Sequence, residues 1–322
     1  MSFYQRVHQA TRTLLSRGVL LFVCLLGHSA QAEVLLLLSS DAPYYGETAD
    51  SLQTAAGEDS ANALTFRVLT LQSPEADAAL TQTWQLIVAI GSKATQQVLS
   101  EPGNSPVLSI FTPKNAFENI KVREDAGSPR SVSVIYLDQP LERVVNLATR
   151  LMPEAKQLGA VFGPISKTWE DGLKSLASQR GIALNSAHLT PEDNPVAVLR
   201  PLVRGSDLFI ALPDHAPLNR AVAKWILHLS FQQKVPVIGF SKAYTNAGAL
   251  ASIYSSPEDI GRQAGQFIVA RLIEGDTTLP QAQYPRYFTI STNFTVAGSL
   301  GIHLPPDNEL YRSLEQQETT LP

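Results

Sequence analysis

The ten residues Leu86-Ile-Val-Ala-Ile-Gly-Ser-Lys-Ala-Thr95 contain the pattern that decides the fold. The unbroken apolar run Leu86–Ile90 is typical of a parallel strand that is covered on both faces of its sheet. The Gly91-Ser92 step that follows it marks the place where such a strand gives way to a helix. The segment therefore predicts one strand–helix unit of an α/β protein.

Similar apolar runs recur along the chain and alternate with longer amphipathic stretches. The expected strands are Val34–Leu38, Leu64–Leu71, Leu86–Ile90, Val107–Phe111, Val132–Leu137, Leu158–Phe162, Ile182–Leu189, Leu208–Leu212, Val235–Phe240, Ala249–Tyr254 and Tyr287–Ile290. The clearest helices are Leu141–Leu151, Trp169–Gln179 and Ile260–Ile273. So many strands exceed one ordinary open sheet, and the pattern predicts an α/β protein of two doubly wound lobes with parallel sheets.

The first 32 residues have the order of a secretory signal peptide. Arginines precede the apolar run Gly18–Leu26, and Ala30-Gln31-Ala32 places small residues at a cleavage site. The apolar run is too short to span a membrane. We expect cleavage after Ala32, a mature chain that begins at Glu33 and does not span a membrane, and a periplasmic location.

Composition excludes several classes of protein. The chain has 322 residues, is 44% hydrophobic and 17% charged, and has a formal net charge of -4, which is ordinary for a globular protein and argues against nucleic-acid binding. The single cysteine, Cys24, lies in the expected signal peptide, so the mature chain has no thiol for a disulfide or a metal. The mature histidines are not spaced as metal ligands, and no cofactor or metal is expected. They are His188, His215, His228 and His303.

Two stretches in the C-terminal half resemble one known family. The first runs from Val235 to Tyr254 and continues with Pro257–Gly265, and the second runs from Tyr287 to Asn293 and continues with Ala297–Ile302. Both look like the uncharacterised ABC-transporter periplasmic substrate-binding family, whose relatives include tryptophan/tyrosine-type binding proteins. Shorter matches, among them Leu137-Asp-Gln-Pro-Leu-Glu-Arg143, extend the resemblance over the mature chain.

The resemblance implies a type I periplasmic-binding-protein fold, in which three crossings join two Rossmann-like lobes that close on a ligand. It places residues 33–137 and 243–282 in lobe one and residues 138–242 and 283–306 in lobe two. On this arrangement Ala249–Tyr254 shares a sheet with Val34–Leu38, whereas Val235–Phe240 lies in the other lobe. Independently of the resemblance, the polar composition of 307–322 predicts a C-terminal tail that forms one or two helical turns and then frays.

In doubly wound sheets the ligand lies outside the carboxyl ends of the strands, and this rule selects the candidate ligand-binding residues. From lobe one they are Ser39, Asp41, Tyr44, Tyr45, Ser92, Lys93, Phe111 and Thr112. From lobe two they are Asp214 and Ser241, and the strand expected to return to lobe one adds Tyr254.

Each role has an ordinary structural alternative. Ser92 and the N–H groups of its helix could hold a carboxylate, or Ser92 could simply cap that helix. Tyr44 and Tyr45, in a loop after the first strand, could stack on a ligand or cover the lobe surface. Asp214 could pair with a ligand ammonium or cap the helix that follows it. We expect a small ligand with a carboxylate and an aromatic or apolar body near Tyr44, Tyr45, Phe111 and Tyr254.

The leading functional prediction is a monomeric solute-binding protein that delivers its ligand to an inner-membrane ABC permease. A periplasmic sensor or accessory module would need the same cleft and stays open as an alternative. A hydrolase is a third hypothesis, since Gly239–Ala243 partly resembles a nucleophile elbow around Ser241 and is followed by Asp259 and His303. A second strand begins too soon after Ser241 for the helix that an elbow requires, and we expect no enzymatic activity.

Overall fold

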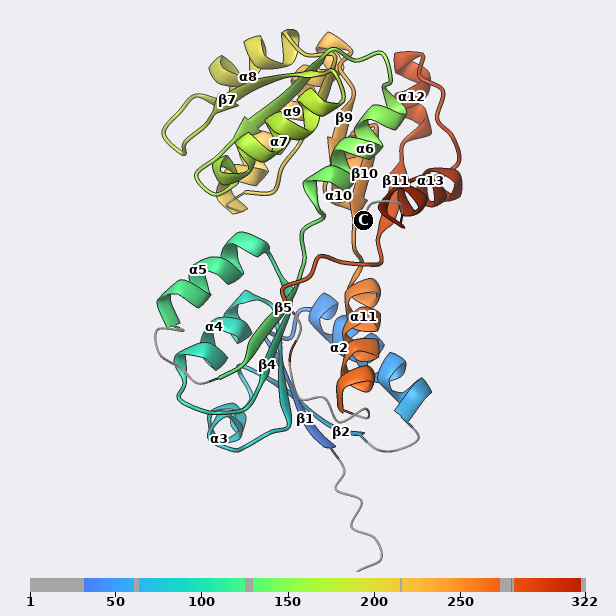
Figure 1. The fold of residues 1–322 in the computed structure, drawn as a ribbon. Helices are drawn as coiled ribbons and strands as arrows, with labels where there is room; N and C mark the ends of the chain where they lie inside the picture. The colour runs from blue at the N-terminus through green and yellow to red at the C-terminus, as the bar shows by residue number, and fades with distance from the viewer. Residues whose placement is uncertain are drawn as a thin grey trace, which may run out of the picture.

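The computed structural model describes residues 32–60, 64–124, 130–214, 216–272, 279 and 281–319. The expected signal peptide lies outside the described residues except for Ala32. The described part forms two stacked lobes, each built on its own sheet, which confirms the two-lobed α/β prediction (Figure 1). Within these ranges no helix combines the length and the hydropathy that a membrane span needs.

Lobe one is built on a five-stranded parallel sheet in the order β2-β1-β3-β4-β5. Its strands are β1 (Ala32–Leu38), β2 (Leu64–Thr70), β3 (Leu86–Ile90), β4 (Val107–Thr112) and β5 (Val132–Tyr136). Its helices are α2 (Pro43–Ser60), α3 (Ala76–Leu80), α4 (Ser92–Ser100), α5 (Lys114–Glu124) and α11 (Pro257–Leu272). Leu36 of β1 packs with α2 and α11, whereas Leu35 packs with α3 and α4 on the opposite face. This double burial explains why β1 is apolar at consecutive positions.

Lobe two contains a six-stranded sheet in the order β11-β10-β9-β8-β6-β7. Its strands are β6 (Gln157–Phe162), β7 (Ala183–His188), β8 (Leu208–Ile210), β9 (Val237–Gly239), β10 (Ala251–Tyr254) and β11 (Thr289–Thr292). Five are parallel, and β11 joins β10 as an antiparallel edge strand. Core contacts place α6 (Leu141–Leu151), α7 (Glu170–Gln179), α12 (Phe294–Leu300) and α13 (Asp307–Thr319) on one face. The other face is covered by α8 (Pro195–Arg204), α9 (Ala216–Gln233) and α10 (Lys242–Ala247).

The expectation that Ala249–Tyr254 shares a sheet with Val34–Leu38 is wrong. β10 pairs in parallel with β9, and both strands belong to the sheet of lobe two. The short helix α10 is sufficient to return the chain to the neighbouring parallel position, so β9 and β10 form one crossover unit. The second crossing therefore follows β10 instead of preceding residue 243.

The third crossing also differs from the expected boundary. Gln283, expected to open the lobe-two strand, exchanges backbone hydrogen bonds with Val134 and Tyr136 of β5, each 2.9 Å long. The chain then passes to β11 (Figure 1). Three segments thus run side by side between the lobes, and each begins or ends at a sheet.

The C-terminal segment is not a frayed tail. Residues Asp307–Thr319 form the 13-residue helix α13, whose Leu310 and Leu314 are buried in the lobe-two core. Near its end, Glu318 pairs with the buried Arg143 of α6. The composition is polar because one face of the helix is exposed, but the spacing of the two leucines lets the other face pack.

Candidate functional site

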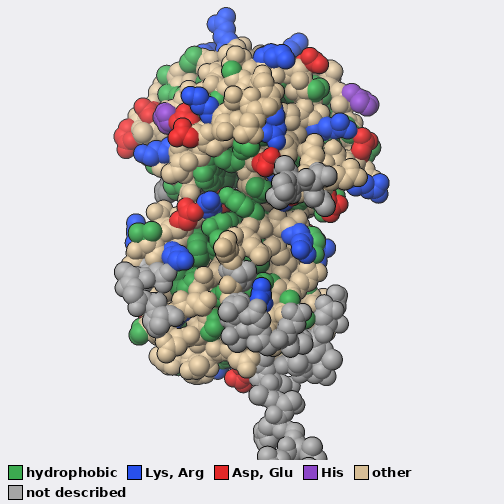
Figure 2. All heavy atoms as spheres, viewed as in Figure 1, with side chains coloured by type: hydrophobic (Ala, Val, Ile, Leu, Met, Phe, Trp, Pro, Cys, Tyr) green, Lys and Arg blue, Asp and Glu red, His purple; other side chains and the backbone are tan. Residues whose placement is uncertain are grey.

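A cavity of about 290 Å³ lies at the carboxyl edge of the lobe-two sheet, beside the crossings. Its walls come from the ends of β8, β9 and β10, from the first crossing, from the start of α6, from Trp169 and from Pro113 of lobe one. The lining is mostly apolar, and hydrophobic side chains gather at the waist between the lobes (Figure 2). Its volume lies near the lower end of about 300–1,000 Å³ that is usual for small-molecule sites.

A second cavity of about 270 Å³ adjoins the first and separates α5 of lobe one from the short 3₁₀ helix η1 (Ser166–Trp169) of lobe two. The two cavities share Pro113, Asp138, Trp169 and Pro213. Across this gap, Asn115 Nδ2 donates to the carbonyl of Ile165 at 3.2 Å. Together the cavities form one cleft between the lobes.

The candidate residues divide between the two sides of this cleft. Ser241 and Tyr254 line the first cavity, and Asp214 lines the second. The lobe-one candidates line neither cavity; they are Ser39, Asp41, Tyr44, Tyr45, Ser92, Lys93, Phe111 and Thr112. The structure therefore places Asp214, Ser241 and Tyr254 along the cleft, with Tyr254 in lobe two and not in lobe one as predicted, and leaves the other candidates outside the cavities.

Three of the lobe-one candidates form an aromatic cluster. Tyr44 stacks on Phe111 with centroids 5.7 Å apart, and Tyr45 meets both rings edge-on. Tyr44 and Tyr45 lie in the first turn of α2 and not in a loop, as we expected. Phe111 has a φ of 55° at a break in the β4–β5 register, a geometry that re-aims the side chain at the strand end. Tyr44 is 44% exposed, so this cluster presents an accessible aromatic surface.

Helix α4 is not capped by Ser92. The N-cap residue is Gly91, whose φ of 92° suits glycine, and a side chain there would collide with Ser39 Oγ and the Tyr45 ring. The capping hydroxyl comes instead from Ser39, which accepts from the Ala94 amide at 2.9 Å and donates to the carbonyl of Ile90. Ser39 is therefore a buried structural residue of lobe one.

The remaining lobe-one candidates separate into buried and exposed groups. Thr112 is buried, and its hydroxyl joins those of Thr95 and Ser109 within the lobe. Asp41 and Lys93 are exposed. Thr112 thus has its hydrogen bonds satisfied by the fold, whereas Asp41 and Lys93 remain in contact with solvent.

Asp214 caps the short helix η1. Its Oδ2 accepts from the amide of Ser166 at 2.7 Å and from the Ser166 hydroxyl at 2.6 Å, while Oδ1 accepts from the Ile165 amide at 3.4 Å. These donors open η1, so the carboxylate fixes the turn that carries Trp169.

Asp138 is a cleft residue that the sequence-based selection missed. It follows the carboxyl end of β5, borders both cavities, and accepts from the backbone N–H of Lys114 at the start of α5. Burial raises the pKa of the Asp138 carboxyl, and the hydrogen bond from Lys114 opposes that rise. The rule that ligands lie outside the carboxyl ends of strands also applies to Asp138. Asp138 was missed because the segment 137–140 was interpreted only as a crossing between the lobes. Trp169 had no such signal, because it lies at the end of η1 and not at a strand end.

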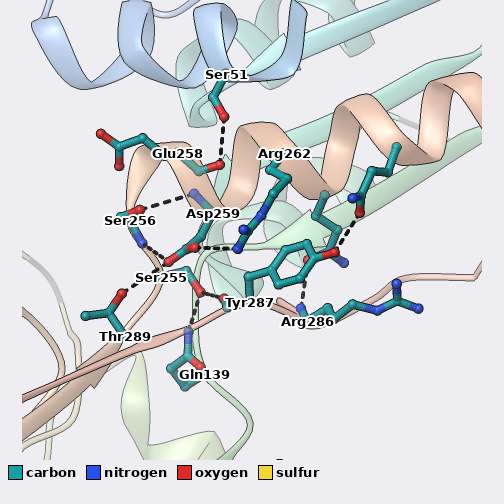
Figure 3. A network of polar contacts seen from close by, with 12 residues as sticks. Ser51, Gln139, Ser255, Ser256, Glu258, Asp259, Arg262, Arg286, Tyr287 and Thr289 are labelled. Carbon is teal, nitrogen blue, oxygen red and sulfur yellow. Dashed lines mark hydrogen bonds and ion pairs between the residues drawn. The ribbon is translucent and has the colours of Figure 1, made fainter. Parts of the chain in front are cut away.

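The three crossings are hydrogen-bonded to one another beside the cavity (Figure 3). Gln139 of the first crossing donates to Ser255 Oγ of the second at 2.8 Å, and Ser255 donates to the Tyr287 carbonyl of the third at 2.6 Å. Gln139 and Ser255 also line the cavity. A ligand in the cavity would therefore contact the segments about which the lobes must move.

The start of α11 extends this hinge network (Figure 3). Ser256 and Asp259 cap α11 reciprocally, each backbone amide donating to the other side chain at 3.1 Å. Asp259 also accepts from Arg262 and from Thr289 of β11. The Arg262 guanidinium lies 3.7 Å from the centroid of the Tyr287 ring. One carboxylate thus joins a lobe-one helix to a lobe-two strand.

The geometry gives the hydrolase hypothesis no support. The helix after Ser241, α10, has only six residues before the chain turns to β10. The recorded hydrogen bonds of the Asp259 carboxylate go to Ser256, Arg262 and Thr289, and His303 is exposed. These partners assign Asp259 to the hinge.

Comparison with known proteins gives a family and a fold. The family model described as ABC transporter substrate binding protein matches residues 72–307. A substrate-binding protein with adhesive properties from Clostridium difficile, solved ligand-free and open, has a TM-score of 0.67 at 17% identity, over 86% of this chain and 97% of that one. A Streptococcus pneumonia ABC domain in complex with L-Trp has a TM-score of 0.58 at 18% identity, over 88% and 98%. No curated protein matched.

A third structure, a conserved domain protein from Vibrio cholerae, has a TM-score of 0.57 at 23% identity, over 88% of this chain and 98% of that one. At these identities the likeness concerns the fold, which is that of type I periplasmic binding proteins. The family model covers well over half of the chain. The chain therefore belongs to the ABC transporter substrate-binding protein family.

Proposed function

We propose that the protein is the periplasmic solute-binding component of an ABC-type transport system, which captures a small molecule between its lobes and delivers it to an inner-membrane permease. The observation that carries the proposal is the cavity of about 290 Å³, because its lining includes Leu137, Gln139 and Ser255 of the crossings. Occupying such a cavity favours the closed arrangement, as in hinge closure of periplasmic binding proteins.

The walls indicate a ligand with an aromatic or apolar body. Trp169, Phe240 and Tyr254 supply rings to the cavity, and Leu212 and Ile253 supply aliphatic surface. The neighbour in complex with L-Trp supports including aromatic amino acids among the first ligands tested.

We assign the second wall to the lobe-one candidates, which would reach the ligand only when the lobes close. The cluster of Tyr44, Tyr45 and Phe111 would cover the apolar body. Ser92, with the backbone N–H groups of Ser92 and Lys93 that open α4, would receive a carboxylate if the ligand has one. Asp214 remains at the edge of the second cavity, where its capping bonds leave it a secondary role.

A thermal-shift screen against amino acids, nucleosides, organic acids and amines tests the proposal. A ligand present at a hundred times its Kd adds about 2.7 kcal/mol to the free energy of unfolding and raises Tm measurably. Small-angle X-ray scattering should then show a smaller radius of gyration with the ligand and the mass of a monomer. A screen in which no class of compound raises Tm contradicts the proposal.

Matched aromatic variants locate the site. Phe240→Ala removes a ring from the cavity wall, and Tyr44→Ala removes one from the lobe-one cluster. Each variant should therefore bind the ligand found in the screen with an affinity at least tenfold lower than that of the wild type. Phe231→Ala is the control, because Phe231 is 76% exposed and lines neither cleft cavity. Equal affinity in Tyr44→Ala would remove lobe one from the proposed site.

Export and delivery complete the proposal. The intact mass of protein from the periplasmic fraction should correspond to a chain that begins at Glu33. A mass that retains residues 1–32 would contradict cleavage. Crosslinking of the ligand-loaded protein to a co-expressed permease tests delivery, and a sensor without a transporter would give no such product.

A further inference from the structure

The charge of the cleft is one-sided. Among the described residues that line the first cavity, Asp138 is the only charged one. The adjoining cavity adds Asp214, and no lysine, arginine or histidine occurs among the described lining residues of either cavity. An anionic ligand group would therefore approach carboxylates across an apolar wall whose described residues supply no cation to receive it.

Asp138 has a structural partner but no counter-ion among the ion pairs recorded for the described ranges. Its carboxylate accepts the backbone N–H of Lys114, whose Nζ points elsewhere, to Glu118 at 3.6 Å and to the Tyr284 hydroxyl at 3.3 Å. Gln139, beside Asp138 in the cavity wall, donates to Ser255. The negative charge is thus held at the cavity by backbone N–H groups and by electrostatic attraction to the Lys114 ammonium, without a direct ion pair in the described ranges.

The other walls suit a positive charge with an apolar body. The rings of Trp169, Phe240 and Tyr254 line the same cavity as Asp138, and aromatic faces attract ammonium groups. Burial raises the pKa of the Asp138 carboxyl, which shows that its charged form is poorly solvated there. A ligand cation would compensate that loss of solvation.

We propose that the cleft selects ligands that carry a positively charged nitrogen on an apolar or aromatic body, and that Asp138 is the specificity-determining residue that receives the charge. The proposal rests on the proposed solute-binding function and adds the charge class of the ligand. It moves the amine-binding role from Asp214, which is bonded to Ser166, to the carboxylate at the first crossing.

Three matched pairs of probes test the charge class: tryptamine against indole-3-propionate, phenethylamine against 3-phenylpropionate, and cyclohexylamine against cyclohexanecarboxylate. Within each pair the body is similar and the charge is reversed. Titration calorimetry at pH 7 should show binding for at least one amine, with affinity at least thirtyfold higher than that of its carboxylate partner. No binding by any amine, or a carboxylate that binds as tightly as its amine, overturns the proposal.

Asp138→Asn then identifies the residue. Asparagine keeps an oxygen that accepts from Lys114, so the variant removes the charge and leaves the cap of α5. The affinity of the best amine should fall at least thirtyfold, equivalent to about 2 kcal/mol. Asp171→Asn, at an exposed position on α7, is the charge-matched control and should bind like the wild type. Unchanged amine affinity in Asp138→Asn would leave Asp138 with only its capping role and overturn the assignment.

This test is separable from that of the proposed function. An anionic ligand found in the thermal-shift screen, and weakened by Phe240→Ala, would leave the solute-binding function intact and overturn the cation selectivity. Failure of every class of compound would remove the function itself.

Discussion

The contact between α2 and α11 gives a stability prediction that can be worked from distances. A Cβ at Gly261 of α11 would lie 2.3 Å from the Thr48 carbonyl oxygen and 2.8 Å from Ser51 Cβ on α2. Real Cβ atoms essentially never approach other atoms this closely, so Gly261→Ala must separate two helices that enclose the lobe-one core. The nearest atom belongs to backbone and cannot rotate away.

The size of the effect follows from two opposing contributions. Overpacking costs about 1–3 kcal/mol, and the rigid backbone places this site at the upper end of that range. Alanine in place of a helical glycine returns about 1 kcal/mol. The net loss in the free energy of unfolding should be about 2 kcal/mol, which lowers Tm by about 3 °C at an unfolding entropy of about 2.1 cal/mol/K per residue.

Urea denaturation followed by circular dichroism measures the change. Gly57→Ala is the matched control on the same helix pair, because a Cβ at Gly57 of α2 meets nothing within 4 Å. It should leave stability unchanged or raise it by about 0.4–1 kcal/mol. The reasoning would be refuted if Gly261→Ala and Gly57→Ala unfolded at the same urea concentration. Helix propensity alone would then account for both variants.

Three further outcomes follow from the hinge, the C-terminal helix and the cleft. Asp259→Ala removes the cap of α11 and should lower the free energy of unfolding, measured with denaturant, by about 1–2 kcal/mol. A smaller loss would mean that other groups accept the hydrogen bonds of the first turn of α11. Leu314→Ala should cost about 2–5 kcal/mol because Leu314 is buried, whereas a frayed segment would lose almost nothing. Burial raises the pKa of the Asp138 carboxyl in the folded state, and its charged neighbours on α5 are Lys114 and Glu118. Because folding then takes up protons, the free energy of unfolding falls as pH rises through that pKa. Ligand-free Asp138→Asn should therefore be at least as stable as the wild type at pH 7, and the difference should shrink as pH falls; a constant difference would contradict the shift.

Element types were readable from the sequence because they depend on local patterns. Leu141–Leu151 forms the predicted helix with the predicted limits, since its apolar residues repeat at helical spacing and Pro153 follows. The Val34–Leu38 run forms an interior strand because apolar residues at consecutive positions can be buried only on two covered faces. The tail was misread because two leucines among thirteen polar-rich residues are a weak signal until a partner surface is known.

The lobe assignment of β10 required the tertiary structure. The sequence shows that Ala249–Tyr254 is a strand, but strand order depends on pairing with β9 and β11, which is a long-range property. The same limitation affected Gln283, whose backbone bonds to β5 are made across more than a hundred residues. Two of the three crossings therefore lie later in the chain than the sequence predicts.

For the site, the sequence by itself determined the edge of the sheet at which the ligand-binding candidates gather, because parallel strands end at the same edge and polar residues follow them. Only the tertiary structure decided what each of those side chains does there. Ser39 caps a helix 55 residues away, and Asp214 caps a turn 48 residues before it. Asp138, which the sequence placed only in a crossing, borders both cavities. A carboxylate or a hydroxyl has the same chemistry in every role, and the role is set by which amide or cavity the fold brings within hydrogen-bond distance.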